Sequence, residues 1–250
     1  MRAGATRVRW LRRARPTLGT LVEVGIGLPG LAHETGFDAA FHAIADVQAC
    51  LSRFEPDSDI ALFNRADAGT QLTVRRHTQR VLEAARQLHD ASDGAFDITL
   101  RSAPRGWRCE GNVLHKLDDA ARIDLGGIGK GYAVDCAIDA LRAAGCTAGW
   151  VNAGGDLRLF GDGELEVVLR DETLGGVRPF GALRDGAFAT SHFGRESRSC
   201  AAAVGPVKAH VSVAASRCLW ADSLTKVVAI TGNASHPLLE RHGAQAWLHR

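Results

Sequence analysis

The sequence has no run of about eighteen uncharged apolar residues, the length that a transmembrane helix needs. It also lacks an apolar stretch directly after its N-terminal arginines, because RPTLGT intervenes before the short run LVEVGIGL. We therefore expect neither a membrane-spanning helix nor a cleaved signal peptide.

Paired cysteine motifs are missing as well. The six cysteines show no CxxC pair and no metal-finger spacing, and they stand at positions 50, 109, 136, 146, 200 and 218. This scatter is typical of reduced, mostly buried thiols. It predicts a cytoplasmic protein and argues against a disulfide framework.

A strong charge of one sign is also absent, since 30 basic and 28 acidic residues leave a formal net charge of +2. No global field therefore selects nucleic acid or a membrane surface as the partner. Residues 1–14 are locally basic and predict a flexible, solvated arm, with a nucleic-acid-binding arm as the weaker alternative. Their arginines are Arg2, Arg7, Arg9, Arg12 and Arg13.

No internal repeat or long linker divides the chain, so residues 15–250 are expected to form one α+β domain with a mixed sheet and flanking helices. Alternation predicts a strand over residues 20–26, and three-and-four spacing predicts helices over residues 34–54 and 77–90. Ser58 is expected to begin a short helix. The least ordered insertions are expected at residues 104–111 and 194–206.

The most specific local pattern is IDLGGIGKGYAVD at residues 123–135, a β-type run that passes through four glycines into a helix. Glycines allow close approach of a diphosphate, and a helix N-terminus offers free N–H groups. The pattern is not a Walker A loop, because Gly131 follows Lys130 where that loop has Ser or Thr. Both an anion cradle and a tight structural connection fit it.

The whole string resembles the signature of the ApbE family of FAD:protein FMN transferases, and other blocks match in the family's order. These blocks are RPTLGT (15–20), FEPDSDIALFN (54–64), DGAFDITL (93–100), VNAGGDLRLFG (151–161), ATSHFGR (189–195) and VSVAASRCLWADSLTKV (211–227). The resemblance covers nearly the full chain. It implies an α+β fold that holds FAD in a cleft, a Mg²⁺ ion, and transfer of FMN to a Thr or Ser of an acceptor protein with release of AMP.

Carried over residue by residue, the resemblance implies that FAD is contacted by Leu18, Phe54, Ala95, Phe96, Asp97, Asp124 and Lys130. Local chemistry also offers a structural role for several of them. Phe54 could be an apolar helix end, Asp97 a turn carboxylate, Asp124 a cap, and Lys130 a solvated residue at a helix start.

For the metal, the resemblance implies a backbone carbonyl at Gly127 and a carboxylate from Asp222, with a further oxygen ligand one helical turn later. Lys226 stands at that position in this sequence, where the family commonly has Thr or Ser. An ammonium donates hydrogen bonds only, so it cannot bind magnesium, although it could replace part of the charge. Thr225 is the neighbouring candidate, about 100° away around an ideal helix.

The family's His-x-x-Asp-Pro segment, whose histidine is a candidate general base, is also missing. The chain has SRSCAAAVGPVKAH there, which leaves His192 and His210 as the nearby candidates. Three hypotheses therefore remain open. The chain is an FMN transferase, an FAD-binding protein without transfer activity, or a diphosphatase that forms FMN and AMP. Either a monomer or a homodimer is compatible with the sequence.

Overall fold

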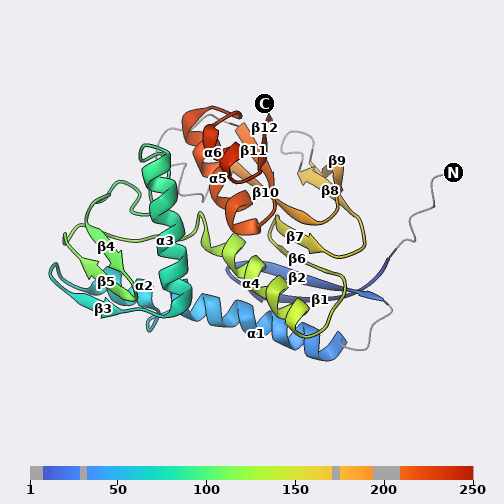
Figure 1. Cartoon of the computed structure of the whole chain (residues 1–250), viewed down its shortest axis with the longest axis horizontal. Helices are drawn as coiled ribbons and strands as arrows, with labels where there is room; N and C mark the ends of the chain where they lie inside the picture. The colour runs from blue at the N-terminus through green and yellow to red at the C-terminus, as the bar shows by residue number, and fades with distance from the viewer. Residues whose placement is uncertain (1–7, 29–32, 171–174, 194–208, 250) are drawn as a thin grey trace.

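An antiparallel seven-stranded sheet is the main element of the computed structural model, which describes residues 8–28, 33–170, 175–193 and 209–249 (Figure 1). The strand order is β1-β2-β6-β7-β10-β11-β12. Their bounds are β1 (Arg9–Thr17), β2 (Thr20–Leu28), β6 (Gly149–Ala153), β7 (Asp156–Phe160), β10 (Gly186–Phe193), β11 (Ala209–Ala215) and β12 (Gln245–His249). The α+β class is confirmed, and all pairings in this sheet are antiparallel where a mixed sheet was expected.

Strand β1 corrects the expectation of a flexible arm over residues 1–14. Residues 9–14 belong to β1, which pairs with β2 from Arg9 opposite Leu28 to Thr17 opposite Thr20, while residues 1–7 lie outside the described part. An edge strand tolerates charged residues, and an arginine guanidinium can also lie against an aromatic ring. Here the Arg12 guanidinium lies 5.3 Å from the Trp150 ring centroid.

Helices α1 (His33–Leu51), α4 (Gly129–Ala143) and α5 (Cys218–Thr231) lie on one face of this sheet (Figure 1). The hairpin of β8 (Leu165–Arg170) and β9 (Val177–Leu183) packs on the other face through Val167, Leu169 and Phe188. Along β10, Ala187, Ala189 and Phe193 belong to the helix-side core, as the alternation of a strand requires. One face of β10 therefore packs on the helices, and the other face packs on the β8–β9 hairpin.

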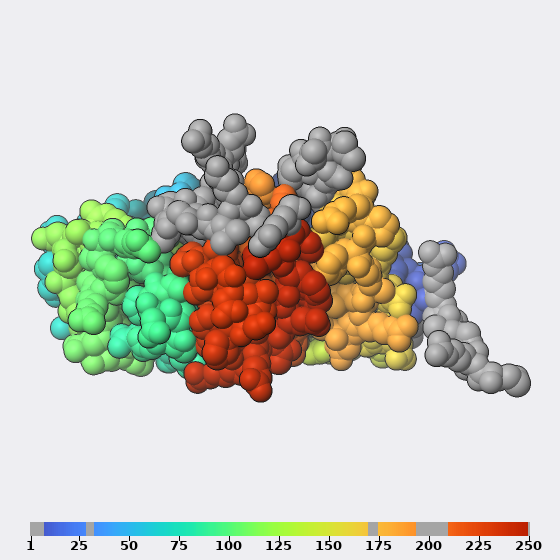
Figure 2. All heavy atoms as spheres, turned by 90° about the horizontal axis from the view of Figure 1, so that it is seen from above, coloured from blue at the N-terminus to red at the C-terminus, as the bar shows by residue number. Residues whose placement is uncertain are grey.

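A smaller unit lies at one end of the molecule, on the left side of Figure 1 and of Figure 2. It contains α2 (Asp59–Arg65), α3 (Arg76–Ala91) and a three-stranded sheet of order β3-β5-β4, formed by β3 (Gln71–Thr73), β5 (Val113–Lys116) and β4 (Trp107–Glu110). The expected Ser58 cap is confirmed, since its side chain accepts a hydrogen bond from the Ala61 N–H. The short helix α6 (Pro237–Arg241) precedes β12.

Strand β4 corrects a second expectation, because it falls inside the supposed insertion at residues 104–111. It pairs with β5 from Trp107 opposite Lys116 to Glu110 opposite Val113. The burial of Trp107 explains this order, because the indole is only 6% exposed and belongs to the main core. The other expected insertion, residues 194–206, lies outside the described residues, as does Cys200.

Helices α4 and α5 are joined by a buried carboxylate. Asp135 of α4 is fully buried and accepts hydrogen bonds from the N–H groups of Cys218 and Leu219, which begin α5, at 2.9 and 3.0 Å. It also pairs with Arg158 at 2.6 Å and Arg217 at 3.3 Å. Asp135 therefore satisfies the otherwise free donors at the N-terminus of α5.

The contact between the two helices also depends on Gly131. A Cβ atom at this position would lie 2.3 Å from the Cys218 carbonyl oxygen and 2.8 Å from the Asp222 Cβ. The absence of a side chain lets α4 approach the backbone of α5. This explains locally why glycine follows Lys130 in the sequence.

Candidate functional site

The glycine-rich turn lies where α4 begins. Ile123 is held by Asn64, whose side chain accepts from the Ile123 N–H at 2.7 Å and donates to its carbonyl at 2.9 Å. The Asp124 N–H donates to the Ile98 carbonyl at 2.8 Å. The expected strand before the glycines is not present, because residues 121–125 have no regular secondary structure and α4 begins at Gly129.

A groove of about 370 Å³ opens beside this turn, and its volume is in the range of small-molecule sites. Three segments form it, namely the β1–β2 turn, the end of α1 with the following loop, and the start of α4. Sequence-predicted residues that line it are Leu18, Phe54, Asp124 and Lys130. The resemblance had assigned all four to FAD.

Phe54 is the most unusual side chain at the groove, because it is 80% exposed. Arg53 lies over its ring at 4.5 Å from the centroid and forms an ion pair with Asp124 at 3.2 Å. The apolar-helix-end alternative for Phe54 is thereby excluded, since α1 ends at Leu51 and the ring is not buried. The exposed aromatic face is suited to stacking against a planar ligand.

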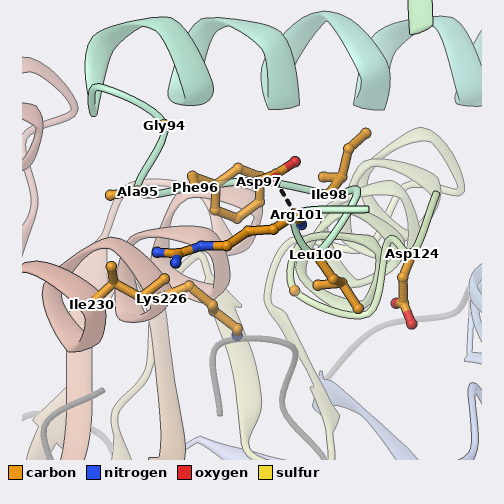
Figure 3. Close-up of a pocket in the computed structure, with 11 residues that line it drawn as sticks. Gly94, Ala95, Phe96, Asp97, Ile98, Leu100, Arg101, Asp124, Lys226 and Ile230 are labelled. Carbon is orange, nitrogen blue, oxygen red and sulfur yellow. Dashed lines mark hydrogen bonds between the residues drawn. The ribbon is translucent and has the colours of Figure 1, made fainter. Parts of the chain in front are cut away.

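A second, smaller pocket shares Asp124 with the groove (Figure 3). It is lined by the loop after α3, by Gly127 of the glycine turn and by Lys226 and Ile230 of α5; the predicted loop residues among its walls are Ala95, Phe96 and Asp97. In Figure 3 the Arg101 side chain extends across this pocket toward α5. The two pockets together place most of the predicted residues along one cleft.

Asp97 has the structural role that local chemistry offered as its alternative. Its carboxylate accepts hydrogen bonds from the N–H and hydroxyl of Thr99, both at 2.8 Å, and from the Arg101 N–H at 2.9 Å. Leu100 and Arg101 have φ values of +51° and +66°, which L-residues rarely adopt. Asp97 thus stabilises a strained turn that forms one wall of the cleft.

Leu18 is strained in the same way, with φ at +54° in the β1–β2 turn. The side-chain oxygen of Gln48 accepts from the Leu18 N–H at 2.9 Å and from the Thr17 hydroxyl at 2.8 Å. Gln48 also donates to Glu55 at 3.1 Å. A helix α1 residue thereby fixes both the turn and the loop that border the groove.

Four charged side chains meet between α4, α5 and β7. Lys130 pairs with Asp156 and Lys226 pairs with Asp222. Both carboxylates are almost fully buried, at 1% exposure for Asp156 and 0% for Asp222. Buried carboxylates need such partners, because an unpaired charge is costly away from water.

The pKa values of this cluster follow from burial and from the mutual charges. Burial raises the pKa of Asp156, and the charge of Asp222 raises it further, while Lys130 and Lys226 lower it in part. Burial acts the same way on Asp222, but the charges of Lys226 and Lys130 outweigh it and lower the pKa. Burial lowers the pKa of Lys130, yet the charges of Asp156 and Asp222 raise it overall. Both shifts favour the charged forms of Lys130 and Asp222.

The donor set around Asp222 does not fit the expected magnesium ion. One carboxylate oxygen accepts from the Lys226 ammonium, and the other accepts from the Gly131 N–H at 3.1 Å. The Thr225 hydroxyl donates to the Asp222 carbonyl at 2.6 Å and bonds to the Ser191 hydroxyl at 2.9 Å. Within the residues described, no group of three or more His, Cys, Asp or Glu side chains could hold a metal ion.

The two candidate base histidines form a pair of their own. His192 of β10 stands opposite His210 of β11, with 2.9 Å between His192 Nδ1 and His210 Nε2. His210 in turn stands opposite His249, whose ring contacts Phe180 of β9 at 5.4 Å between centroids. The three histidines therefore lie on the sheet face that carries the β8–β9 hairpin.

Asp222 and Lys226 lie on the other face of the sheet. Ser191, the residue directly before His192, accepts a hydrogen bond from Lys226 at 3.0 Å. Successive strand residues point to opposite faces, so His192 is directed away from Lys226. The predicted FAD residues line the cleft together with Gly127 and Lys226, whereas Asp222 and Thr225 are fully buried and line neither pocket. His192 and His210 lie on the opposite face of the sheet from Lys226.

Sequence reasoning missed four side chains of this cleft, namely Gln48, Arg53, Arg101 and Ser191. Arg53 carries a local signal, since it directly precedes the predicted Phe54. Gln48 and Ser191 carry none, because their contacts join distant segments, and Arg101 carries none, because its position depends on a left-handed turn that its residue type does not favour. Gln48 reaches a turn 30 residues earlier in the chain, and Ser191 reaches Lys226 35 residues later.

No helix among the residues that the structure describes is long and apolar enough to cross a membrane. The five described cysteines are all free thiols.

Comparison with known proteins identifies the family. The ApbE family model matches residues 18–120 and 108–248. Relatives named FAD:protein FMN transferase include one from Vibrio cholerae, 25% identical over 58% of this chain and 53% of its own, and one from Chlamydia pneumoniae, 26% identical over 50% and 48%. The chain thus spans about half the length of these curated relatives.

Solved structures show the same fold over a larger part of the chain. The apo flavinyl transferase ApbE of Pseudomonas stutzeri has a TM-score of 0.80 at 24% identity, covering 99% of this chain and 93% of that one. The flavin transferase ApbE of Vibrio cholerae has a TM-score of 0.82 at 20% identity, with 96% and 93% covered. Because the family model spans nearly the whole sequence, this chain belongs to the ApbE family.

Proposed function

We propose that this chain transfers FMN from FAD to a Thr or Ser hydroxyl of an acceptor protein and releases AMP. The observation that carries the proposal is the cleft itself. Residues from the β1–β2 turn, the loop after α3, the glycine turn and α5 line two pockets that share Asp124. Membership of the ApbE family supports the same reaction.

The cleft supplies the positive charge that phosphoryl transfer needs. In the reaction the acceptor oxygen attacks the phosphorus of the FMN half and loses its proton, while the bond from that phosphorus to the bridging oxygen breaks and AMP leaves. The ammonium groups of Lys130 and Lys226 lie where they can stabilise the charge that develops on the phosphates. The glycine turn lines both pockets through Gly126 and Gly127, so its backbone can come close to the diphosphate there. No step is assigned to magnesium, because the residues around Asp222 do not form a ligand set for it.

Phe54 provides a test of the ligand's position. Phe54→Ala should weaken FAD binding about tenfold, since stacking of a base on an aromatic ring contributes about 1–3 kcal/mol. The melting temperature should not change, because the ring is 80% exposed. Titration of protein against FAD fluorescence measures the dissociation constant.

Two variants control the Phe54 experiment. Phe54→Tyr keeps an aromatic face and should bind FAD like the original protein. Leu117→Ala removes another exposed apolar side chain, which is 52% exposed and does not line the groove, and it should have no effect. Equal FAD affinity of Phe54→Ala and the original protein would place the flavin elsewhere.

The reaction is tested with purified protein, FAD and an acceptor domain that the Vibrio cholerae relative modifies. We expect AMP release that depends on the acceptor, together with flavin fluorescence that remains on the acceptor after denaturation. Each preparation of acceptor is also incubated with the Vibrio cholerae enzyme, so that an unreactive acceptor is recognised.

Two other outcomes would each contradict transfer. Formation of AMP and free FMN without any acceptor would identify a diphosphatase. Tight FAD binding with neither product, while the Vibrio cholerae enzyme modifies the same acceptor, would identify an FAD-binding protein without transfer activity.

A further inference from the structure

The Lys226 ammonium is held in one place by the surrounding protein. It donates to the Asp222 carboxylate, to the Asp222 carbonyl at 3.0 Å and to the Ser191 hydroxyl at 3.0 Å. An ammonium has three donors, so these partners fix it fully. Its side chain is only 5% exposed. Lys226 therefore acts as a positive charge of fixed position, unlike a lysine that moves freely in solvent.

The side chain that carries this fixed charge forms part of the cleft wall. Lys226 lines the smaller pocket together with Gly127 of the glycine turn and Asp124, and Figure 3 shows it entering from α5 opposite the loop that carries Phe96. Lys130 lines the adjoining groove on the other side of the turn. Two ammonium groups, each backed by a buried carboxylate, thus flank the turn that is proposed to hold the diphosphate.

The same arrangement opposes a divalent metal at Asp222. Magnesium needs oxygen lone pairs in a near-octahedral shell. One oxygen of Asp222 faces the Lys226 ammonium and the other faces the Gly131 N–H, so a metal ion there would lie against a like charge and a backbone donor. Either a magnesium ion or the Lys226 ammonium can therefore lie beside Asp222, but not both.

We infer that Lys226 is a built-in cation that takes the place of a divalent metal beside the FAD diphosphate, so that this chain binds and cleaves FAD without such a metal. The inference rests on the proposed function, because it assigns a role to Lys226 at the FAD site. It extends that function because FMN transfer by this chain would then not require a divalent metal.

The direct test needs no substitution. FAD affinity is measured by fluorescence titration of the full chain in EDTA and in millimolar MgCl₂, and AMP release is measured in the same two buffers after the acceptor domain is added. We expect the dissociation constants in the two buffers to agree within about twofold, a difference well below 1.4 kcal/mol. Loss of FAD binding in EDTA would overturn the inference. Absence of FAD binding in both buffers would instead overturn the proposed function.

Two substitutions then distinguish a charge from a ligand. Lys226→Thr removes the ammonium and supplies an oxygen, so FAD binding should weaken at least about tenfold in EDTA and recover in MgCl₂. Lys226→Met fills the space without an oxygen, so binding should weaken equally in both buffers. Recovery of Lys226→Met in MgCl₂, or unchanged affinity of both variants in EDTA, would contradict the inference.

Lys116→Met is the matched control for loss of a buried lysine. Lys116 is 1% exposed, donates to the Phe63 carbonyl at 3.2 Å and lies outside both pockets. Its removal should lower stability without changing the response of FAD binding to magnesium. Circular dichroism and thermal melting confirm that each variant is folded before its affinity is compared.

Discussion

Replacing Asp222 with asparagine should lower acceptor-dependent AMP release from FAD at least about 100-fold, a loss of roughly 2.7 kcal/mol in transition-state stabilisation. Asparagine keeps the shape of the side chain but removes the charge that pairs with Lys226 and accepts from the Gly131 N–H. The Lys226 ammonium would then lack its buried counter-charge. The ammonium would no longer be held at the position from which its charge stabilises the diphosphate.

Stability should fall in the same variant, because breaking one side of a buried ion pair costs about 3–5 kcal/mol. A double variant, Asp222→Asn with Lys226→Met, separates the two effects. Removal of both charges leaves no unpaired buried ion, so its urea midpoint should return toward the original value. Its AMP release should remain low. If activity returned together with stability, Asp222 and Lys226 would have a structural role only.

The second large effect is expected at Asp135, outside the cleft. Asp135→Ala should lower the free energy of unfolding by about 3–5 kcal/mol, since the fully buried carboxylate pairs with Arg158 and accepts from two backbone N–H groups of α5. For a chain of this size we expect the melting temperature to fall by roughly 6–20 °C. Thermal melting followed by circular dichroism measures it.

Asp139 provides the matched control for Asp135. It lies one turn later on α4 and pairs with Arg217 at 3.2 Å, but its side chain is 53% exposed. Asp139→Ala should therefore cost less than about 1 kcal/mol, as exposed ion pairs usually do. Comparable losses in the two variants would show that the charge of this helix, and not the cap of α5, determines its stability.

Elements with local signals were predictable from the sequence. The Ser58 cap, the apolar stripe of α1 and the left-handed Gly232 that ends α5 each depend on residues within a few positions of one another. Strand β1 was not predictable in this way. Its arginines resemble a solvated arm in the sequence, because only the folded structure pairs this strand with β2 and places their guanidinium groups over aromatic rings.

The site also contains some residues that a local sequence pattern indicates and others that depend on long-range contacts. The glycine turn and its family resemblance indicated Asp124, Gly127 and Lys130, which lie close together along the chain. The pairing of Lys130 with Asp156 joins α4 to a distant strand, and no local pattern contains it. The left-handed turn at Leu100 and Arg101 was equally hidden, because neither residue type favours positive φ and the hydrogen bonds of Asp97 stabilise it.

The sequence contains only part of the information that places His192 relative to the cleft. Alternation along β10 shows that Ser191 and His192 face opposite sides of the sheet. The sequence does not tell which side α5 covers, and that assignment requires the long-range packing of α5 on β10 and β11.

The packing of α5 has a consequence for protein engineering. Most side chains of this helix are buried, including both residues of the Asp222–Lys226 pair, whereas the cleft walls at residues 52–55 and 100–101 are largely exposed or partly exposed loop positions. Random libraries that vary α5 would mainly yield unfolded clones. A search for acceptance of modified flavins should therefore diversify these two loops and keep α5 unchanged.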